Sequence, residues 1–174
     1  MKIFWFFLVF CFYGCTISLD GPEQPVKYVD LEKFMGKWYV IAFTPTFVDE
    51  GAENGIETYR LGEDGNIEIE YTFSIDGEFE SHLQTGIVQP EPSNAKWRLK
   101  YNWLLSFDYY LVVEIDPEYE YTVIGVPDRS YVWVMSREKK MDEKLLVEIL
   151  TRLKERGYDM EKNRKNEILF MKIS

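Results

Sequence analysis

The chain has 174 residues, of which 46% are hydrophobic and 17% aromatic, and it carries a formal net charge of −10 at pH 7. A protein this acidic repels nucleic acid phosphates and gains no polybasic attraction to anionic membranes, so we expect no nucleic acid partner. The length is that of one domain with a substantial core.

The first fourteen residues predict an export signal that is not part of the folded domain. Lys2 precedes an uncharged apolar stretch over residues 3–13, which is too short to cross a bilayer as a helix. The stretch ends in FYGC, which resembles the lipobox of bacterial lipoproteins, where the cysteine becomes the lipid-modified first residue. We therefore expect a lipoprotein-type signal peptide over residues 1–14, a lipid anchor at Cys15 and a tether over residues 15–28. The alternatives are an ordinary signal peptide cut nearby and an anchor that is never cleaved.

Residues 29–174 are expected to form a single domain without disulfide bonds. The chain has two cysteines, Cys11 and Cys15, and both precede this region. An exported domain that lacks disulfides depends on its core for stability.

From Trp38 onward, apolar side chains recur with the period of two that is typical of half-buried β-strands. In NIEIEYTF, for example, two isoleucines, a tyrosine and a phenylalanine share one face, while two glutamates and a threonine share the other. Turn-forming sequences such as GEDG, IDGE and VPDRS separate the alternating stretches. The pattern predicts eight strands, over residues 37–44, 55–61, 66–73, 80–88, 96–103, 109–115, 120–126 and 131–137.

The predicted connections are too short to hold crossover helices, so consecutive strands must pair antiparallel. Closing eight such strands into an up-and-down barrel leaves no free edge and gives room for one small ligand. After the eighth strand the apolar period changes, and Asp142 can cap an amphipathic helix that ends at Gly157. Its apolar stripe, expected to pack outside the barrel, consists of Leu145, Leu146, Ile149, Leu150 and Leu153. With a short last strand over 167–170, the predicted fold class is all-β with one C-terminal helix.

The two ends of the barrel are distinguished by a tryptophan and an arginine. In an up-and-down barrel, the start of the first strand and the end of the eighth lie at the same end. Trp38 begins the first strand and Arg137 ends the eighth, and a guanidinium over an indole ring is a favourable contact. We expect this pair to close the barrel floor, and Gly36 to let the preceding turn cross that floor closely.

Three short stretches resemble the conserved regions of the lipocalins: GKWY, DPEYEY and the SR that follows YVWVM. FMGKWYVIA, GVPDRSYVWVMSR and the following helix are especially similar to the bacterial outer-membrane lipocalins, which are themselves lipoproteins. The resemblance covers residues 29–170 and implies a carrier or store of one small hydrophobic molecule. A fatty acid or a lysophospholipid is the ligand it implies, in the bacterial cell envelope, with no cofactor and no catalysis.

With the floor at Trp38, the loops over 45–54, 74–79, 104–108 and 127–130 are expected at an open mouth. Hydrophobic and aromatic walls with a few hydroxyl groups suit a ligand calyx. The alternative is a filled barrel, in which case the protein would bind a partner through its loops. Inward parity predicts that the calyx is lined by Phe47, Glu57, Tyr59, Ile69, Tyr71, Phe73, Tyr101, Trp103, Tyr110, Val112, Tyr131 and Trp133.

The titratable residues give little support to an enzyme or a metal site. Glu57 is expected near the mouth, where it is solvated or meets a ligand amine, and Glu114 is expected inside near Arg137. These two acids would be too far apart for shared acid–base work. His82, the single histidine, is expected on the outer face, so no metal or catalytic triad is predicted. An isomerase-type lipocalin would also need a cavity cysteine, which this domain lacks.

Overall fold

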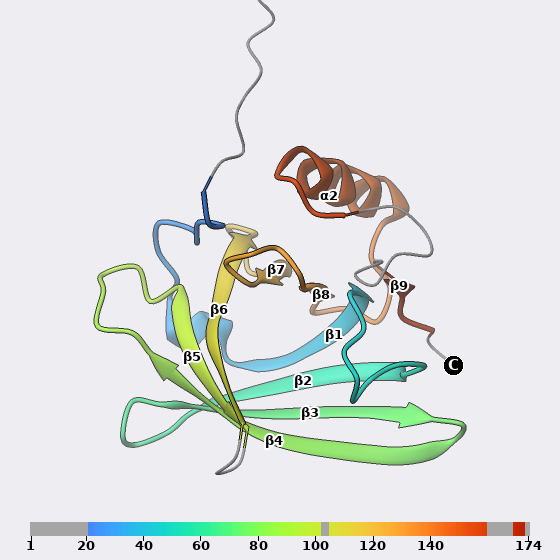
Figure 1. Cartoon of the computed structure of the whole chain (residues 1–174), viewed down its shortest axis with the longest axis horizontal. Helices are drawn as coiled ribbons and strands as arrows, with labels where there is room; N and C mark the ends of the chain where they lie inside the picture. The colour runs from blue at the N-terminus through green and yellow to red at the C-terminus, as the bar shows by residue number, and fades with distance from the viewer. Residues whose placement is uncertain (1–20, 102–104, 160–168, 173–174) are drawn as a thin grey trace, which may run out of the picture.

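The computed structural model describes residues 21–101, 105–159 and 169–172. Its eight antiparallel strands form a closed barrel, since each pairs with the next and β1 pairs with both β2 and β8 (Figure 1). The predicted eight-stranded up-and-down barrel is therefore confirmed. Cys15 and Trp103 lie outside the described residues, as does the signal peptide predicted over residues 1–14. The strands are β1 (Gly36–Phe43), β2 (Glu53–Leu61), β3 (Ile67–Ile75), β4 (Glu78–Val88), β5 (Lys96–Tyr101), β6 (Leu105–Ile115), β7 (Tyr121–Gly125) and β8 (Val132–Ser136).

The alternation of side chains produces the inner and outer faces of these strands. On β3, Ile67, Ile69, Tyr71 and Phe73 are buried in the barrel, while the residues between them are exposed or half-buried. The predicted strand ends are close to the observed ones, except that β6 begins at Leu105 and not at residue 109. It starts earlier because its pairing with β5 continues as far as Tyr101.

A short helix that the sequence pattern did not predict, α1 (Leu31–Phe34), closes one end of the barrel. Asp30 caps it, because its carboxylate accepts hydrogen bonds from the amides of Glu32 and Lys33. Phe34 is fully buried, and its ring lies 5.1–5.3 Å from the rings of three inward-facing aromatic residues, namely Trp38, Tyr59 and Trp97. The helix thus fills the barrel bottom with aromatic packing.

The predicted C-terminal helix is confirmed as α2 (Glu143–Glu155), with Asp142 as its N-cap. Ile149 and Leu153 are fully buried against the outer face of the barrel, where they contact side chains of β1, β6, β7 and β8. Figure 1 shows α2 beside these strands. A two-residue strand, β9 (Leu169–Phe170), pairs with the end of β1 outside the barrel.

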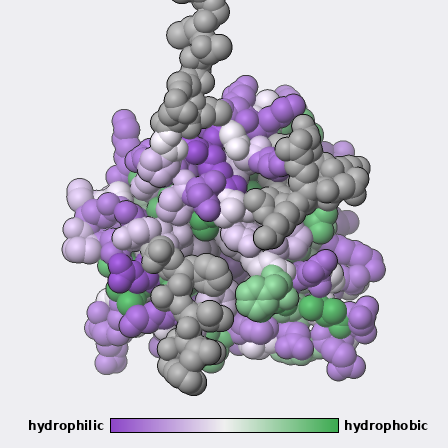
Figure 2. All heavy atoms as spheres, viewed as in Figure 1, coloured by the Kyte–Doolittle hydropathy of each residue, from purple (hydrophilic) through white to green (hydrophobic). Residues whose placement is uncertain are grey.

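The described surface is largely hydrophilic, as the net charge predicts, and polar side chains cover most of the face in Figure 2. Neither of the helices in the described part of the chain has the length and apolar character needed to span a bilayer. Buried apolar side chains of the described residues form one cluster inside the barrel and another under α2.

Candidate functional site

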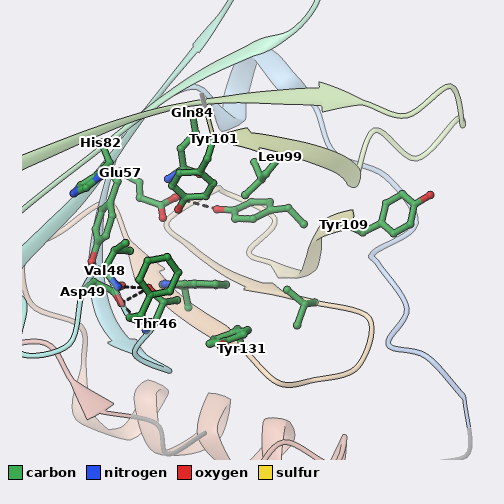
Figure 3. Close-up of a pocket in the computed structure, with 15 residues that line it drawn as sticks. Thr46, Val48, Asp49, Glu57, His82, Gln84, Leu99, Tyr101, Tyr109 and Tyr131 are labelled. Atoms are coloured by element: carbon green, nitrogen blue, oxygen red, sulfur yellow. Dashed lines mark hydrogen bonds between the residues drawn. The ribbon is translucent and has the colours of Figure 1, made fainter. Parts of the chain in front are cut away.

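A cavity of about 180 Å³ lies inside the barrel and opens at the end opposite α1. The β1–β2 loop and the β7–β8 connection form its rim, and strands β2 to β6 and β8 form its wall. Figure 3 shows most of the labelled side chains converging on the cavity, with Tyr109 pointing away from it. The lining residues are Thr46, Phe47, Val48, Asp49, Glu57, Tyr71, His82, Gln84, Leu99, Tyr101, Tyr109, Tyr110, Val126, Tyr131 and Trp133.

Seven of the twelve residues predicted to line the calyx do line this cavity: Phe47, Glu57, Tyr71, Tyr101, Tyr110, Tyr131 and Trp133. Four others are buried in the packed core and do not reach the cavity: Tyr59, Ile69, Phe73 and Val112. The remaining one, Trp103, lies outside the described residues. The lower part of the barrel is filled because rings from α1, β2 and β5 meet there, so the open space is confined to the mouth half.

The prediction that His82 faces outward was wrong. His82 stands opposite Tyr71 in the β3–β4 ladder, and directly opposite residues share a face of the sheet. Its imidazole stacks on the ring of Phe73 at 5.4 Å and lines the cavity, while the neighbouring Leu83 is 71% exposed. Hydrophobicity misassigned the two faces, because the inward face of β4 carries the polar His82 and Gln84.

The prediction that Glu114 faces the barrel interior was also wrong. A β-bulge between Val112 and Glu114 inserts one extra residue in β6. The alternation of inward and outward side chains is therefore interrupted after Val112, which is the last inward-facing residue before the bulge. Glu114 therefore lies on the outer side, where it pairs with Arg152 of α2 and accepts a 2.9 Å hydrogen bond from Tyr121. Its partner is a helix arginine and not Arg137.

The expectation that Glu57 is solvated near the mouth was wrong: it lies at the bottom of the cavity and is only 5% exposed, because the aromatic side chains around it exclude water. The hydroxyl of Tyr110 donates to Glu57 Oε2 at 3.0 Å, and the hydroxyl of Tyr59 donates to the same oxygen. Burial raises the pKa of Glu57 to about 7, against the opposing effect of these two hydrogen bonds. This carboxyl group therefore changes charge near neutral pH.

A second carboxyl group, that of Asp49, enters the cavity from the β1–β2 loop and is 1% exposed. Its Oδ1 accepts hydrogen bonds from the amide and hydroxyl of Thr46 at 2.6 and 2.7 Å, and Tyr71 donates to Oδ2 at 3.4 Å. Burial raises the pKa of Asp49 in spite of these bonds. Sequence reasoning missed Asp49 because loop residues carry no alternation, although TPTFVD holds a Thr and an Asp that bond to each other.

Arg137 and Trp38 close the opposite end of the barrel. The guanidinium lies over the indole ring at 3.6 Å, and it donates to the carbonyl oxygens of Lys33, Lys37, Phe34 and Tyr119. Gly36 adopts φ +97°, a conformation that favours glycine, next to this guanidinium. The Arg137 side chain thus closes the floor of the barrel and connects it by hydrogen bonds to α1 and to the β6–β7 turn.

Within the described residues, no three His, Cys, Asp or Glu side chains are grouped so that they could hold a metal ion. The site is instead an aromatic cavity with two buried acids, which is suited to hold an organic molecule.

Comparisons with known proteins agree with this geometry. The family model described as a lipocalin-like domain matches residues 29–167. Temperature-induced lipocalin-1 of Arabidopsis thaliana is 30% identical over 151 residues, which cover 80% of this chain and 79% of the relative. The outer membrane lipoprotein Blc of Vibrio cholerae is 28% identical over 153 residues, which cover 83% of this chain and 90% of the relative.

The fold is also shared with solved structures of distant sequence. Insecticyanin from the tobacco hornworm Manduca sexta matches with a TM-score of 0.68 at 16% identity, over 87% of this chain and 85% of the other. At this level of identity the likeness establishes the architecture of the barrel and its helix.

Proposed function

Since the chain belongs to the lipocalin family, we propose that it binds and carries one small hydrophobic or amphipathic molecule inside the barrel. The observation that carries this proposal is the cavity, which is open at one end, closed by Arg137 and Trp38 at the other, and walled mainly by aromatic rings. Binding sites for small molecules have this character, with a few placed polar groups.

The ligand class that we propose is a single-chain lipid, either a fatty acid or a lysophospholipid. An engineered apolar cavity of roughly 150 Å³ takes up benzene. The cavity of about 180 Å³ therefore holds one end of such a molecule, and the rest lies along the rim. Phe47 supports this arrangement, because it lies on the rim loop and is 78% exposed.

We further propose that the protein is a membrane-anchored lipoprotein of the bacterial envelope, with Cys15 as the acylated residue. The FYGC sequence and the similar outer membrane lipoproteins support this. The described chain leaves the barrel at the rim, because Arg129 of the β7–β8 connection donates to the carbonyl of Gly21 at 2.9 Å. A short tether from there would keep the mouth near the membrane that holds the anchor.

The proposed role is binding and not catalysis. Among the described residues that line the cavity there is no serine or cysteine to act as a nucleophile, and His82 stacks on a phenyl ring. The polar groups that remain are carboxyl, amide and hydroxyl groups, which orient a ligand.

Tryptophan fluorescence tests the proposed function, because Trp133 lines the cavity. Titration with a single-chain lipid should change the emission and saturate at about one ligand per chain, as an eight-stranded barrel has space for one. Trp133→Phe should remove most of the change while a competing fluorescent lipid is still displaced. Absence of both the emission change and any displacement would favour a protein that acts through its loops.

A further inference from the structure

Among the described residues that line the cavity, the two carboxyl groups are the acidic side chains and no lysine or arginine accompanies them. Glu57 and Asp49 both line it and are 5% and 1% exposed. Residues 102–108, whose side chains are not described, have the sequence NWLLSFD and contribute no basic residue. The nearby Lys96 lies 3.9 Å from the ring of Tyr109, on the outer face of the barrel.

Aromatic rings surround the acids. Tyr110 stacks on Trp97 at 5.4 Å and lies 6.3 Å from Trp133, and Trp133 lies 6.1 Å from Tyr131. The faces of such rings carry negative potential and attract organic cations, most strongly where water is excluded. Carboxylates and ring faces together therefore favour a positively charged group.

An anionic ligand would meet the opposite situation. A fatty acid carboxylate placed in this cavity would be a third buried acid, with no guanidinium or ammonium group among the described lining residues to pair with it. Burying an unpaired charge is costly, and a like charge nearby adds to the cost. Of the two proposed ligand classes, the cavity therefore disfavours a fatty acid bound with its carboxylate inside, and it favours a lysophospholipid whose headgroup carries an amine.

Resting on the proposed function, we propose that this cavity selects cationic amphipaths, with a protonated or quaternary amine held at Glu57. The apolar part of the molecule lies against Tyr131 and Trp133 and leaves past the rim at Phe47. Both acids accept hydrogen bonds from neighbouring side chains. We assign the amine to Glu57 because Glu57 lies on β2 at the inner end of the cavity, beside Tyr110, whereas Asp49 lies on the rim loop.

Calorimetric titration of the purified full-length protein with three probes of equal chain length tests this. Dodecylammonium, dodecanol and dodecanoate share the chain length and carry small headgroups of charge +1, 0 and −1 at pH 8, and each is used below its micelle concentration or solubility limit. We expect the cation to bind at least tenfold more tightly than the carboxylate, with the alcohol between them. Equal binding of all three would overturn the cation inference and leave the proposed function intact. Binding of none would remove both.

Glu57→Gln keeps the shape of the side chain and should reduce the preference for the cation several-fold. Glu53→Gln is the matched control, since it lies on the same strand, removes the same charge and pairs outside the cavity with Lys172. A preference that persists in Glu57→Gln, or that falls equally in Glu53→Gln, would overturn the role of Glu57.

A pH titration of the wild-type protein gives a second readout that needs no variant of Glu57. The groups that face or neighbour this carboxyl are Tyr59, Tyr71, Tyr101, Tyr110, Asp49 and His82. Because the pKa of Glu57 is raised to about 7, the preference for the cation should decline between pH 8 and pH 6. The titration is repeated with His82→Gln, which removes the imidazole that lines the cavity. A preference that is flat over this range in both proteins would contradict the proposal.

Discussion

Replacing Arg137 with alanine should destabilise the barrel without weakening ligand binding. The guanidinium lies 3.6 Å from the centre of the Trp38 ring and donates to four main-chain carbonyl oxygens, at distances of 2.7–3.3 Å. Those carbonyls belong to α1, the start of β1 and the β6–β7 turn, so one side chain joins three segments. The mouth of the cavity lies at the other end of the barrel.

The magnitude follows from these contacts. A cation over an indole contributes about 0.5–2 kcal/mol, and a hydrogen bond from a charged donor contributes about 1.5–3 kcal/mol. The four bonds are not additive, and water reaches part of the site once the side chain is removed. We therefore expect a loss of about 2–4 kcal/mol in the free energy of unfolding, which lowers the melting temperature by roughly 4–15 °C.

Urea denaturation followed by circular dichroism measures this loss. Arg137→Lys is the control, since it keeps the positive charge but lacks the planar guanidinium group with its several donors. Its free energy of unfolding should lie between those of the wild type and Arg137→Ala. A change within about 0.5 kcal/mol, typical of an ordinary surface substitution, would refute the reasoning. A matching loss of ligand affinity would show that the floor and the mouth are coupled.

Three further predictions concern the cavity and the anchor. Burial raises the pKa of Glu57 to about 7 from its ordinary value of 4.5, so the folded state binds this proton more tightly than the unfolded state does. The free energy of unfolding of the wild type relative to Glu57→Gln should therefore fall by up to about 3 kcal/mol as pH rises from 4.5 to above 7, and a pH-independent difference would contradict this. Leu99→Trp, which adds a ring to the cavity wall, should weaken ligand binding at least tenfold in a fluorescence displacement assay, and unchanged affinity would place the ligand elsewhere. Cys15→Ser should abolish incorporation of labelled palmitate, and equal labelling of the variant would exclude acylation at Cys15.

The barrel could be predicted from the sequence because its strands are marked by a regular alternation of apolar and polar residues. Strict alternation in stretches such as NIEIEYTF gave the strand order and the inner faces, and the change of period after Ser136 gave α2. The contact between Trp38 and Arg137 follows from topology alone, because both residues lie at the same end of neighbouring strands.

The site was less predictable, because its residues depart from that pattern. His82 and Gln84 are polar yet face inward, so hydrophobicity assigned β4 to the wrong faces, and only its pairing with β3 corrects this. The bulge in β6 moves Glu114 outward, and Asp49 comes from a loop with no period. Pairing register, bulges and loop paths are long-range properties that a local pattern does not encode.

Mass spectrometry of an organic extract from the purified full-length protein tests the central claim most directly. If the barrel carries one small amphipathic molecule, about one equivalent should be released per chain from the wild type. The Leu99→Trp variant, purified in the same way, should release little or none. Equal amounts from both proteins, or no bound molecule in either together with no uptake of added amphipath, would contradict the account.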